Sequence, residues 1–222
     1  MSSSSEPPVR STEIRRVDHP LIQHHLARLR NTATAPIEFR NLIRRVAVLL
    51  AYEATKDLQT APLKVETPLM ATEGAALKQS IGLVPILRAG LGMVDAVFDL
   101  IPQAEVWHLG LYRDEKTAQP IEYYSKLPHS EPVDVALVLD PMLATGGSAT
   151  AAVSTLREWG VPIIKLLTII ASQEGIAEVH AQDSEVQIFV TAIDPELNDQ
   201  KFIIPGLGDA GDRIFNTFKQ HD

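Results

Sequence analysis

Four short, almost purely apolar segments between residues 81 and 193 constrain the fold of this chain more than any other feature. They are IGLVPIL (81–87), VDVALVLD (133–140), IIKLLTIIAS (163–172) and VQIFVTAI (186–193). A strand that is apolar throughout has to be buried on both faces, and this is typical of a parallel sheet between layers of helices. The sequence therefore predicts an α/β fold, a parallel sheet with helices on both faces.

The segments between these runs carry helix signals. Residues 20–58 repeat apolar side chains at helical spacing, with Pro36 in the first turn of the second helix. Further helices are predicted at 148–160, where Gly160 ends the helix, at 174–182 and at 212–220. Short strands and a turn are expected over 61–80, a strand over 105–112 and a polar connection over 113–132.

Length and composition limit the classes of protein that this chain can belong to. At 222 residues we expect a disordered Ser/Pro/Glu-rich tail at 1–16 and a single domain at 17–222. The absence of cysteine excludes thiolate chemistry, and the net charge of −8 disfavours nucleic-acid binding. No run of 18 apolar residues and no signal-peptide pattern is present, so a soluble, cytoplasmic protein is expected.

In a parallel sheet, ligands bind beyond the carboxyl ends of the strands. The residues that follow each predicted strand are therefore the first candidates for a functional site. They are Arg88-Ala89-Gly90, Arg113-Asp114-Glu115, Asp140 to Ser148, and Asp194-Pro195.

The segment VLDPMLATGGSAT has the chemistry of an anion-binding loop. It joins a buried strand to a helix through two glycines, so unpaired amides at the helix start can approach an anion closely. A Walker loop is excluded because no lysine follows the glycines, and a nucleophile elbow is excluded because Thr150 stands where its last glycine is needed. A plain helix cap after a buried strand stays open as the alternative.

A second glycine-rich segment, GLGDAG (206–211), matches the G-x-G-x-x-G pattern of dinucleotide-binding loops. That pattern requires a preceding strand and a complete βαβ unit. Only 11 residues follow Gly211, and Pro205 interrupts the preceding strand, so the dinucleotide interpretation fails. A glycine-rich turn before a C-terminal helix is the simplest alternative.

Several blocks together resemble a known family. DPMLATGGS resembles the phosphoribosyl-pyrophosphate signature of the type I phosphoribosyltransferases. Within that family, the chain resembles the uracil phosphoribosyltransferases in particular. Four further segments carry this resemblance: LLAYEAT (49–55), VPILRAGLGM (84–93), GLYRDEKTAQPIEYYSKLP (110–128) and IIPGLGDAG (203–211). The resemblance runs from about residue 17 to the end. It implies the type I fold, a Rossmann-like parallel sheet with a small hood formed by N- and C-terminal segments and a mobile β-loop.

The resemblance also implies a reaction. Members transfer the phosphoribosyl group from 5-phospho-α-D-ribose 1-diphosphate (PRPP) to N1 of uracil, giving UMP and diphosphate, which is a step of pyrimidine salvage. A non-catalytic, nucleotide-sensing or regulatory relative is the alternative, and an enzyme that uses a purine or orotate ranks third because GLGDAG resembles only the uracil group.

Roles for individual residues follow from the same resemblance. PRPP binding is implied for Arg88, Arg113, Asp140, Pro141, Met142, Leu143, Ala144, Thr145, Gly146, Gly147, Ser148 and Asp209. Uracil binding is implied for Ile203, Gly208, Asp209 and Ala210. Catalytic roles are implied for Arg113, Asp140 and Asp209. For either arginine, a surface salt bridge is the structural alternative.

Two departures from the family pattern matter. Pro141 replaces the second of two adjacent acids that many type I relatives carry, as it does in the uracil group, so Mg²⁺ is expected through PRPP and water and not through a direct protein ligand. Phe202 stands where relatives commonly have tyrosine, and a hydroxyl is thereby lost. Because members form dimers or larger assemblies and some respond to GTP, a homo-oligomer is expected and GTP is a candidate effector.

Overall fold

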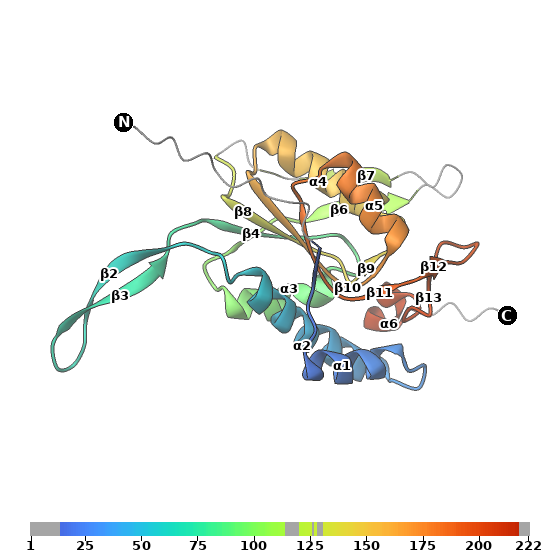
Figure 1. Ribbon diagram of the computed structural model, residues 1–222, viewed down its shortest axis with the longest axis horizontal. Helices are drawn as coiled ribbons and strands as arrows, with labels where there is room; N and C mark the ends of the chain where they lie inside the picture. Colours follow the sequence, from blue (N-terminus) through green and yellow to red (C-terminus); the bar gives the residue numbers. More distant parts are fainter. Residues whose placement is uncertain (1–13, 114–119, 126, 128–130, 218–222) are drawn as a thin grey trace, which may run out of the picture.

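A central parallel sheet organises the molecule in the computed structural model, which describes residues 14–113, 120–125, 127 and 131–217 (Figure 1). Within these residues the sheet has seven strands in the order β1–β11–β10–β8–β4–β5, and β9 pairs with β10. The strands are β1 (Ile14–Arg16), β4 (Ile81–Pro85), β5 (Glu105–Val106), β8 (Val135–Leu139), β9 (Met142–Leu143), β10 (Ile163–Ser172) and β11 (Gln187–Asp194). Every pair in this sheet is parallel.

Burial of the central strands confirms the prediction made from their composition. All residues of β4 and β8 are buried, and so is β10 apart from its first residue. Successive side chains point to opposite faces of a strand. Leu167 accordingly joins an apolar core with Phe39, whereas Leu166 joins a second core with Leu156. Full burial of one such side chain contributes about 1.5–3 kcal/mol.

Helices cover both faces of the sheet (Figure 1). One layer contains α1 (Pro20–Arg30), α2 (Pro36–Ala54), α3 (Leu91–Leu100) and α6 (Ala210–Phe215). The other contains α4 (Gly147–Trp159) and α5 (Gln173–Gln182). Proline occupies the first turn of α1 and of α2, as expected for Pro36. Gly160 ends α4 with a φ of +99°, which confirms its predicted role as a helix stop.

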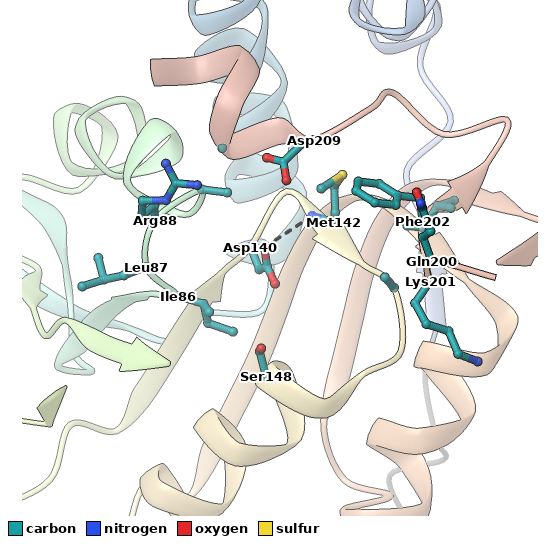
Figure 2. Close-up of a pocket in the computed structure, with 14 residues that line it drawn as sticks. Ile86, Leu87, Arg88, Asp140, Met142, Ser148, Gln200, Lys201, Phe202 and Asp209 are labelled. Atoms are coloured by element: carbon teal, nitrogen blue, oxygen red, sulfur yellow. Dashed lines mark hydrogen bonds between the residues drawn. The ribbon is translucent and has the colours of Figure 1, made fainter. Parts of the chain in front are cut away.

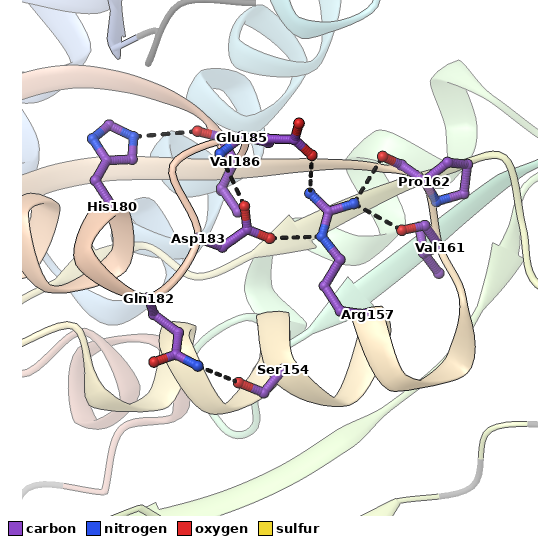
Figure 3. A network of polar contacts seen from close by, with 9 residues as sticks. All are labelled: Ser154, Arg157, Val161, Pro162, His180, Gln182, Asp183, Glu185 and Val186. Carbon is purple, nitrogen blue, oxygen red and sulfur yellow. Dashed lines mark hydrogen bonds and ion pairs between the residues drawn. The ribbon is translucent and has the colours of Figure 1, made fainter.

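The last turn of α4 is joined to the loop after α5 by a polar network centred on Arg157 (Figure 3). Arg157 Nε donates to Asp183 Oδ2 at 2.6 Å, and Nη1 donates to the carbonyls of Val161 and Pro162 at 2.9 and 2.8 Å. Burial is the largest single influence and raises the pKa of Asp183. The hydrogen bonds from Arg157 and from the Glu185 amide, with the charges of Arg157 and His180, together outweigh it, so the pKa lies below its usual range. The network therefore fixes the C-terminal end of α4.

The prediction of one continuous strand over 105–112 is wrong. It is divided into β5, at the sheet edge, and β6 (Leu109–Arg113), which forms an antiparallel hairpin with β7 (Pro120–Ser125). Between them, the Trp107 amide still bonds to Leu83 O at 2.9 Å, while the Trp107 ring meets that of Trp159 in an edge contact at 6.0 Å. The chain therefore leaves the sheet here and crosses toward α4.

Both ends of the chain differ in part from expectation. Ile14–Arg16 form β1 on the edge of the sheet, paired with β11, so these residues do not belong to the tail expected over 1–16. The rest of that tail lies outside the described residues. The C-terminal helix α6 is shorter than predicted, because Asn216 adopts a left-handed φ of 57° and ends it. Residues 218–220 of the predicted helix are outside the described part of the chain.

Two further antiparallel pairs complete the described structure. The expected strands of 61–80 are β2 (Thr60–Glu66) and β3 (Ala71–Leu77), a hairpin that projects far from the body (Figure 1). β12 (Glu196–Leu197) pairs with β13 (Ile203–Ile204) beside α6. In the described parts of the chain, no helix combines the length and the apolarity that crossing a membrane requires.

Candidate active site

A cavity of about 360 Å³ opens at the carboxyl edge of the sheet and is called the main cavity below (Figure 2). The turn after β4, the loop after β8 and the segment 200–211 surround it. Its lining residues are Ile86, Leu87, Arg88, Ala89, Asp140, Met142, Ala144, Ser148, Gln200, Lys201, Phe202, Ile203, Asp209 and Gly211. β8 lies next to β4 in the sheet, so the first two of these segments emerge side by side.

The 140–148 loop forms one wall and ends at the start of α4. Gly146 has a φ of +87°, and a Cβ there would lie 2.8 Å from the carbonyl oxygen of Gly175, so only glycine fits. The loop encloses a smaller hollow of about 70 Å³, lined by Asp140, by 142–148 and by Ala149. The unpaired amides of a helix start, with the helix dipole behind them, make this hollow suitable for an anion.

Ser172, at the end of β10, anchors this loop from behind. Its Oγ donates to Ala144 O at 2.5 Å and accepts from the amide of Gly175 at 2.9 Å, so one hydroxyl caps α5 and fixes the loop together. A Cβ on Gly175 would lie 2.4 Å from Ala144 O, which explains glycine at that position. Sequence reasoning missed Ser172, although a serine between a buried strand and a helix is an N-cap signal.

Asp140 stands at the end of β8 and faces the main cavity (Figure 2). Burial raises the pKa of Asp140 to about 7, and a weak hydrogen bond from the Met142 amide, at 3.4 Å, acts in the opposite direction. A carboxyl group in this state is poised to ionise when a ligand supplies hydrogen-bond donors or positive charge.

The turn after β4 brings Arg88 to the opposite wall. Gly90 allows this turn to lie against β8, because a Cβ there would be 2.3 Å from Leu139 O. The peptide bond between Leu87 and Arg88 is cis. Arg88 Nη2 lies 3.3 Å from Asp212 Oδ1, and Nη1 donates to Thr217 Oγ1 at 3.3 Å. The guanidinium group therefore lies at the cavity mouth, beside the start of α6.

The 203–211 loop forms the third wall. Gly206 and Gly208 have φ values of +61° and +77°, and a Cβ on Gly206 would collide with Ile203 O at 2.0 Å. Asp209 then caps α6, since its Oδ1 accepts from the Asp212 amide at 2.8 Å. The glycines of this segment therefore shape a tight loop before a short helix.

A partly buried ion pair holds the 203–211 loop to the N-terminal helices. Nη1 and Nη2 of Arg30, at the end of α1, each donate to the Asp194 carboxylate at 2.7 Å. Asp194 also accepts from the Gly206 amide at 3.0 Å, and Arg30 donates to Gly206 O at 2.8 Å. Asp194, a strand-end candidate in the sequence, therefore fixes the loop and does not line the main cavity.

A second arginine, Arg213, holds the far end of the same loop. Its guanidinium group donates to the carbonyls of Leu29, Asn31 and Leu207, the last two at 2.7 Å. It also lies over the Phe39 ring, 4.1 Å from the centroid. Burial lowers the pKa of Arg213. Three carbonyl acceptors and an aromatic face compensate for taking this charge out of water.

Comparison with known proteins shows the family. The model of a family described as "Uracil phosphoribosyltransferase" matches residues 16–217. The chain belongs to the uracil phosphoribosyltransferase family. It is 56% identical to the uracil phosphoribosyltransferase of Roseiflexus sp. (strain RS-1) over 199 residues, which cover 90% of this chain and 96% of the relative.

Two further relatives support the assignment. The uracil phosphoribosyltransferase of Desulfitobacterium hafniense (strain DSM 10664 / DCB-2) is 52% identical over 202 residues, covering 90% of this chain and 97% of the relative. Among solved structures, the AQ2163 protein from Aquifex aeolicus superposes with a TM-score of 0.86 at 36% identity, covering 91% of this chain and 97% of that protein.

Most residues that the uracil phosphoribosyltransferase resemblance singled out lie around the main cavity or the smaller hollow. Arg88, Asp140, Met142, Ala144, Ser148, Ile203 and Asp209 line the main cavity. Leu143, Thr145, Gly146 and Gly147 line the hollow beside it. Sequence reasoning did not single out Gln200 and Lys201, which carry no motif and line the main cavity only because the β12–β13 connection lies beside it.

The remaining predicted residues lie elsewhere. Pro141 is buried, and its carbonyl accepts from the amides of Ile169 and Ile170. Ala210 is buried beneath the loop, and Gly208 lines a separate hollow behind it. Arg113 ends β6, but its side chain is outside the described structure, so its role stays a prediction.

The family implies magnesium, which requires oxygen ligands in or near the main cavity. Asp140 and Asp209 both line it and supply oxygen ligands of the kind that Mg²⁺ prefers. Among the described residues, no group of three His, Asp or Glu side chains is arranged to hold a metal ion. These residues fit a magnesium ion that is held partly by substrate oxygens and water.

Proposed function

We propose that the main cavity transfers the phosphoribosyl group of PRPP to N1 of uracil, giving UMP and diphosphate. The observation that carries the proposal is the meeting of three walls in one cavity: a helix start suited to a phosphate, an arginine turn suited to a diphosphate and a glycine loop suited to a flat base. The membership of the uracil phosphoribosyltransferase family supports the reaction.

The 5-phosphate is assigned to the 140–148 loop. Backbone amides of 144–148 and the Ser148 hydroxyl group supply donors at the start of α4, and the anchor at Ser172 keeps them in place. Asp140, next to this loop, is assigned to the ribose hydroxyl groups. Hydrogen bonds from those hydroxyls favour the carboxylate over the acid, and they lower the raised pKa of Asp140.

The diphosphate is assigned to Arg88 and to Arg113. The leaving group gains negative charge as its bond to the anomeric carbon breaks, so cations aimed at it stabilise the transition state. A guanidinium group suits this role because it stays charged and binds phosphate oxygens in a bidentate manner. The Asp140 carboxylate favours the positive charge that develops on the ribose ring. Magnesium, when bound with PRPP, neutralises further charge on the leaving diphosphate.

The base is assigned to the 203–211 loop. Met142, Ala144, Phe202 and Ile203 give the main cavity apolar surface against which a flat ring can lie. We assign the polar edge of uracil to backbone groups of Ile203, with Asp209 beside them. Gly208 and Ala210 do not line the main cavity, so their part in base binding stays a prediction from the family resemblance. Cytosine reverses one acceptor and one donor on that edge, and an unpaired buried polar group costs about 1–3 kcal/mol.

A turnover assay tests the proposal. The full chain is incubated with PRPP, Mg²⁺ and radiolabelled uracil, cytosine, orotate or hypoxanthine, and the nucleotides are separated. We expect UMP from uracil and no CMP from cytosine; the absence of turnover with every base would contradict the proposal. Ser148→Ala should raise the KM for PRPP severalfold, whereas Ser154→Ala, on the same helix but bonded only to Gln182, should not.

We also propose that the chain assembles as a homo-oligomer. The support is the β2–β3 hairpin, which projects from the body (Figure 1). It carries exposed apolar side chains, Leu63, Val65, Leu69, Met70 and Leu77. Light scattering should give a mass of two copies or more, and Leu69→Ser with Met70→Ser at the hairpin tip should lower it. GTP as an effector stays a prediction from the family, and adding GTP to the assay checks it. A cytoplasmic location stays a prediction from the sequence.

A further inference from the structure

The Arg88 side chain needs a positioning partner if it is to bind a diphosphate reproducibly. It is 58% exposed, and its long stem has many rotamers available in water. In the contacts described above, its guanidinium group meets only the α6 region, through Asp212 in the first turn and Thr217 just after the end of the helix. Figure 2 shows Arg88 on this side of the main cavity. An unrestrained arginine loses more conformational entropy when an anion binds.

Asp212 and Thr217 surround this guanidinium group in a closed set of contacts. Nη2 lies 3.3 Å from Asp212 Oδ1, and Nη1 lies 3.3 Å from Thr217 Oγ1. The Thr217 hydroxyl group in turn donates to the same Asp212 oxygen at 2.7 Å. The Asp212 Oδ1 atom therefore orients both Arg88 and Thr217, and the Thr217 hydroxyl group in turn accepts from Arg88.

Asp212 is itself held in place by the 203–211 loop. Its amide donates to Asp209 Oδ1 at 2.8 Å, and its carbonyl accepts from the Thr217 amide at 3.2 Å. The next residue, Arg213, is buried and bonded to three carbonyls, which fixes the backbone that carries Asp212. The position of the Arg88 guanidinium group therefore depends on the conformation of the loop assigned to the base.

Arg88 and Asp209 both lie close to Gly211. A Cβ at this position would lie 3.2 Å from Asp209 Oδ1, which is tight, and 3.6 Å from Arg88 Nη2, which is ordinary contact. The guanidinium group and the Asp209 carboxylate therefore face the same side of Gly211.

We infer that Asp212 is a positioning residue, which aims Arg88 at the diphosphate and couples the diphosphate site to the 203–211 loop. The pair holds two of the five N–H donors of the guanidinium group and leaves the others for an anion. A contribution to stability alone does not explain the arrangement well, because ion pairs as exposed as this one contribute about 0–1 kcal/mol. The inference rests on the proposed function, since it requires Arg88 to bind an anion.

Coupling of this kind has to be reciprocal. If an ordered 203–211 loop improves diphosphate binding through Asp212, a bound diphosphate improves uracil binding by the same factor. Removing the Asp212 carboxylate should therefore weaken PRPP binding and also reduce the dependence of uracil binding on a bound diphosphate.

The test combines binding and kinetics of the full chain. Inorganic diphosphate and PRPP, each with Mg²⁺, are titrated calorimetrically into the wild type, Asp212→Asn, Arg88→Ala and the double variant. We expect Asp212→Asn to weaken both ligands about 5–10-fold and to raise the KM for PRPP with a smaller change in kcat. Arg88→Ala should weaken them more, and adding Asp212→Asn to it should cause no further loss.

Controls separate positioning from a general effect of charge or folding. Asp95→Asn removes the acidic partner of another arginine, Arg44, and should leave both affinities unchanged; Asp95 is more exposed than Asp212, 75% against 29%. Thr217→Val, which keeps Asp212, should weaken diphosphate about 2–3-fold, and it tests the inference if Asp212→Asn folds poorly. Unchanged or tighter diphosphate binding by a folded Asp212→Asn, or additive losses in the double variant, would overturn the inference. A wild type that binds neither ligand would instead contradict the proposed function.

Discussion

The 140–148 loop and the 203–211 loop form two walls of the same cavity, but they are built in different ways. The first joins neighbouring elements, β8 and α4, and its external anchor, Ser172, lies only 28 residues from the carbonyl that it binds. The second is held by Arg30 and Arg213 through contacts that join residues 164–184 positions apart. The first loop depends on its own strand and helix, whereas the second depends on the whole fold.

This difference predicts distinct consequences of damage. A change in the 140–148 loop should affect phosphate binding and leave stability nearly intact, because the sheet beneath it is complete without it. A change in the anchors of the 203–211 loop should lower stability and base affinity together. Four substitutions, ordered by the size of the expected effect, test the comparison.

Gly146→Ala should have the largest effect on activity. A methyl group there meets Gly175 O and Glu178 Cβ at 2.8 Å, with a φ of +87° that side chains disfavour, so the loop has to shift away from its anion-binding shape. We expect kcat/KM for PRPP to fall about 100-fold or more, equivalent to about 2.7 kcal/mol. Gly160→Ala, also at positive φ but 3.4 Å from its nearest neighbour, should cost stability without changing kcat/KM; equal kinetic losses would contradict the local explanation.

Asp140→Asn should lower turnover about 30-fold, since a neutral amide stabilises developing positive charge less well than a carboxylate. Its effect on stability should depend on pH. The folded-state pKa of about 7 lies above the unfolded value of 3.8, so the free energy of unfolding of the wild type falls as pH rises between these values. Asp140→Asn has no carboxyl group to ionise, so its free energy of unfolding does not fall in this way. It should exceed that of the wild type by about 2 kcal/mol above pH 7 and equal it near pH 4.

Urea denaturation at pH 4, 6 and 8 measures this difference directly. A stability gain that does not change with pH would show that the Asp140 carboxyl group ionises normally in the folded protein. Turnover equal to that of the wild type would remove Asp140 from the reaction.

Arg30→Met should raise the KM for uracil about 10-fold and the KM for PRPP by a smaller factor, because the 203–211 loop acts on PRPP only indirectly, through Asp212 and Arg88. It should also lower the free energy of unfolding by about 2–4 kcal/mol, because Asp194 is left buried without its ion pair. Arg28→Met, two residues earlier in an exposed pair with Glu38, is the matched control and should cost less than about 1 kcal/mol. An equal rise in both KM values would mean that the two loops are not independent.

Phe202→Tyr should have the smallest effect. Phe202 lines the main cavity and is 38% exposed, so there is room for the hydroxyl group that relatives commonly carry. We expect the KM for uracil to change less than about threefold, because an exposed hydroxyl group exchanges one hydrogen bond with water for another. Phe215→Tyr, similarly exposed on α6, is the control; a tenfold gain from Phe202→Tyr alone would show that the family hydroxyl binds substrate.

The same difference between the loops explains what could be predicted from the sequence. Short segments of the sequence predict the apolar strands, the order of the elements and the 140–148 loop. In each segment the signal is local: a hydrophobic period, a glycine or a helix start. The cavity position at strand ends follows from the parallel sheet. These features were therefore predictable from the chain itself, before the family resemblance added residue roles.

The features that could not be predicted from the sequence depend on contacts between residues far apart in the chain. Arg30 is one of several arginines in the N-terminal helices, and nothing near it in the sequence indicates that its partner is Asp194. β1 has only three residues, too few to show a period, and forms because β11 offers an open edge. The break between β5 and β6 depends on Trp107 meeting Trp159, more than 50 residues later. Asp212 has no motif of its own and matters only through Arg88.

The anchoring of the 203–211 loop has a consequence for synthesis of the chain. A ribosome makes the N-terminus first, so α1 with Arg30 emerges long before Asp194 and Arg213 are added. A nascent chain can therefore complete the turn between β8 and α4 before the wall that we assign to the base exists. That wall forms only after residues 194–213 have been made and packed against α1.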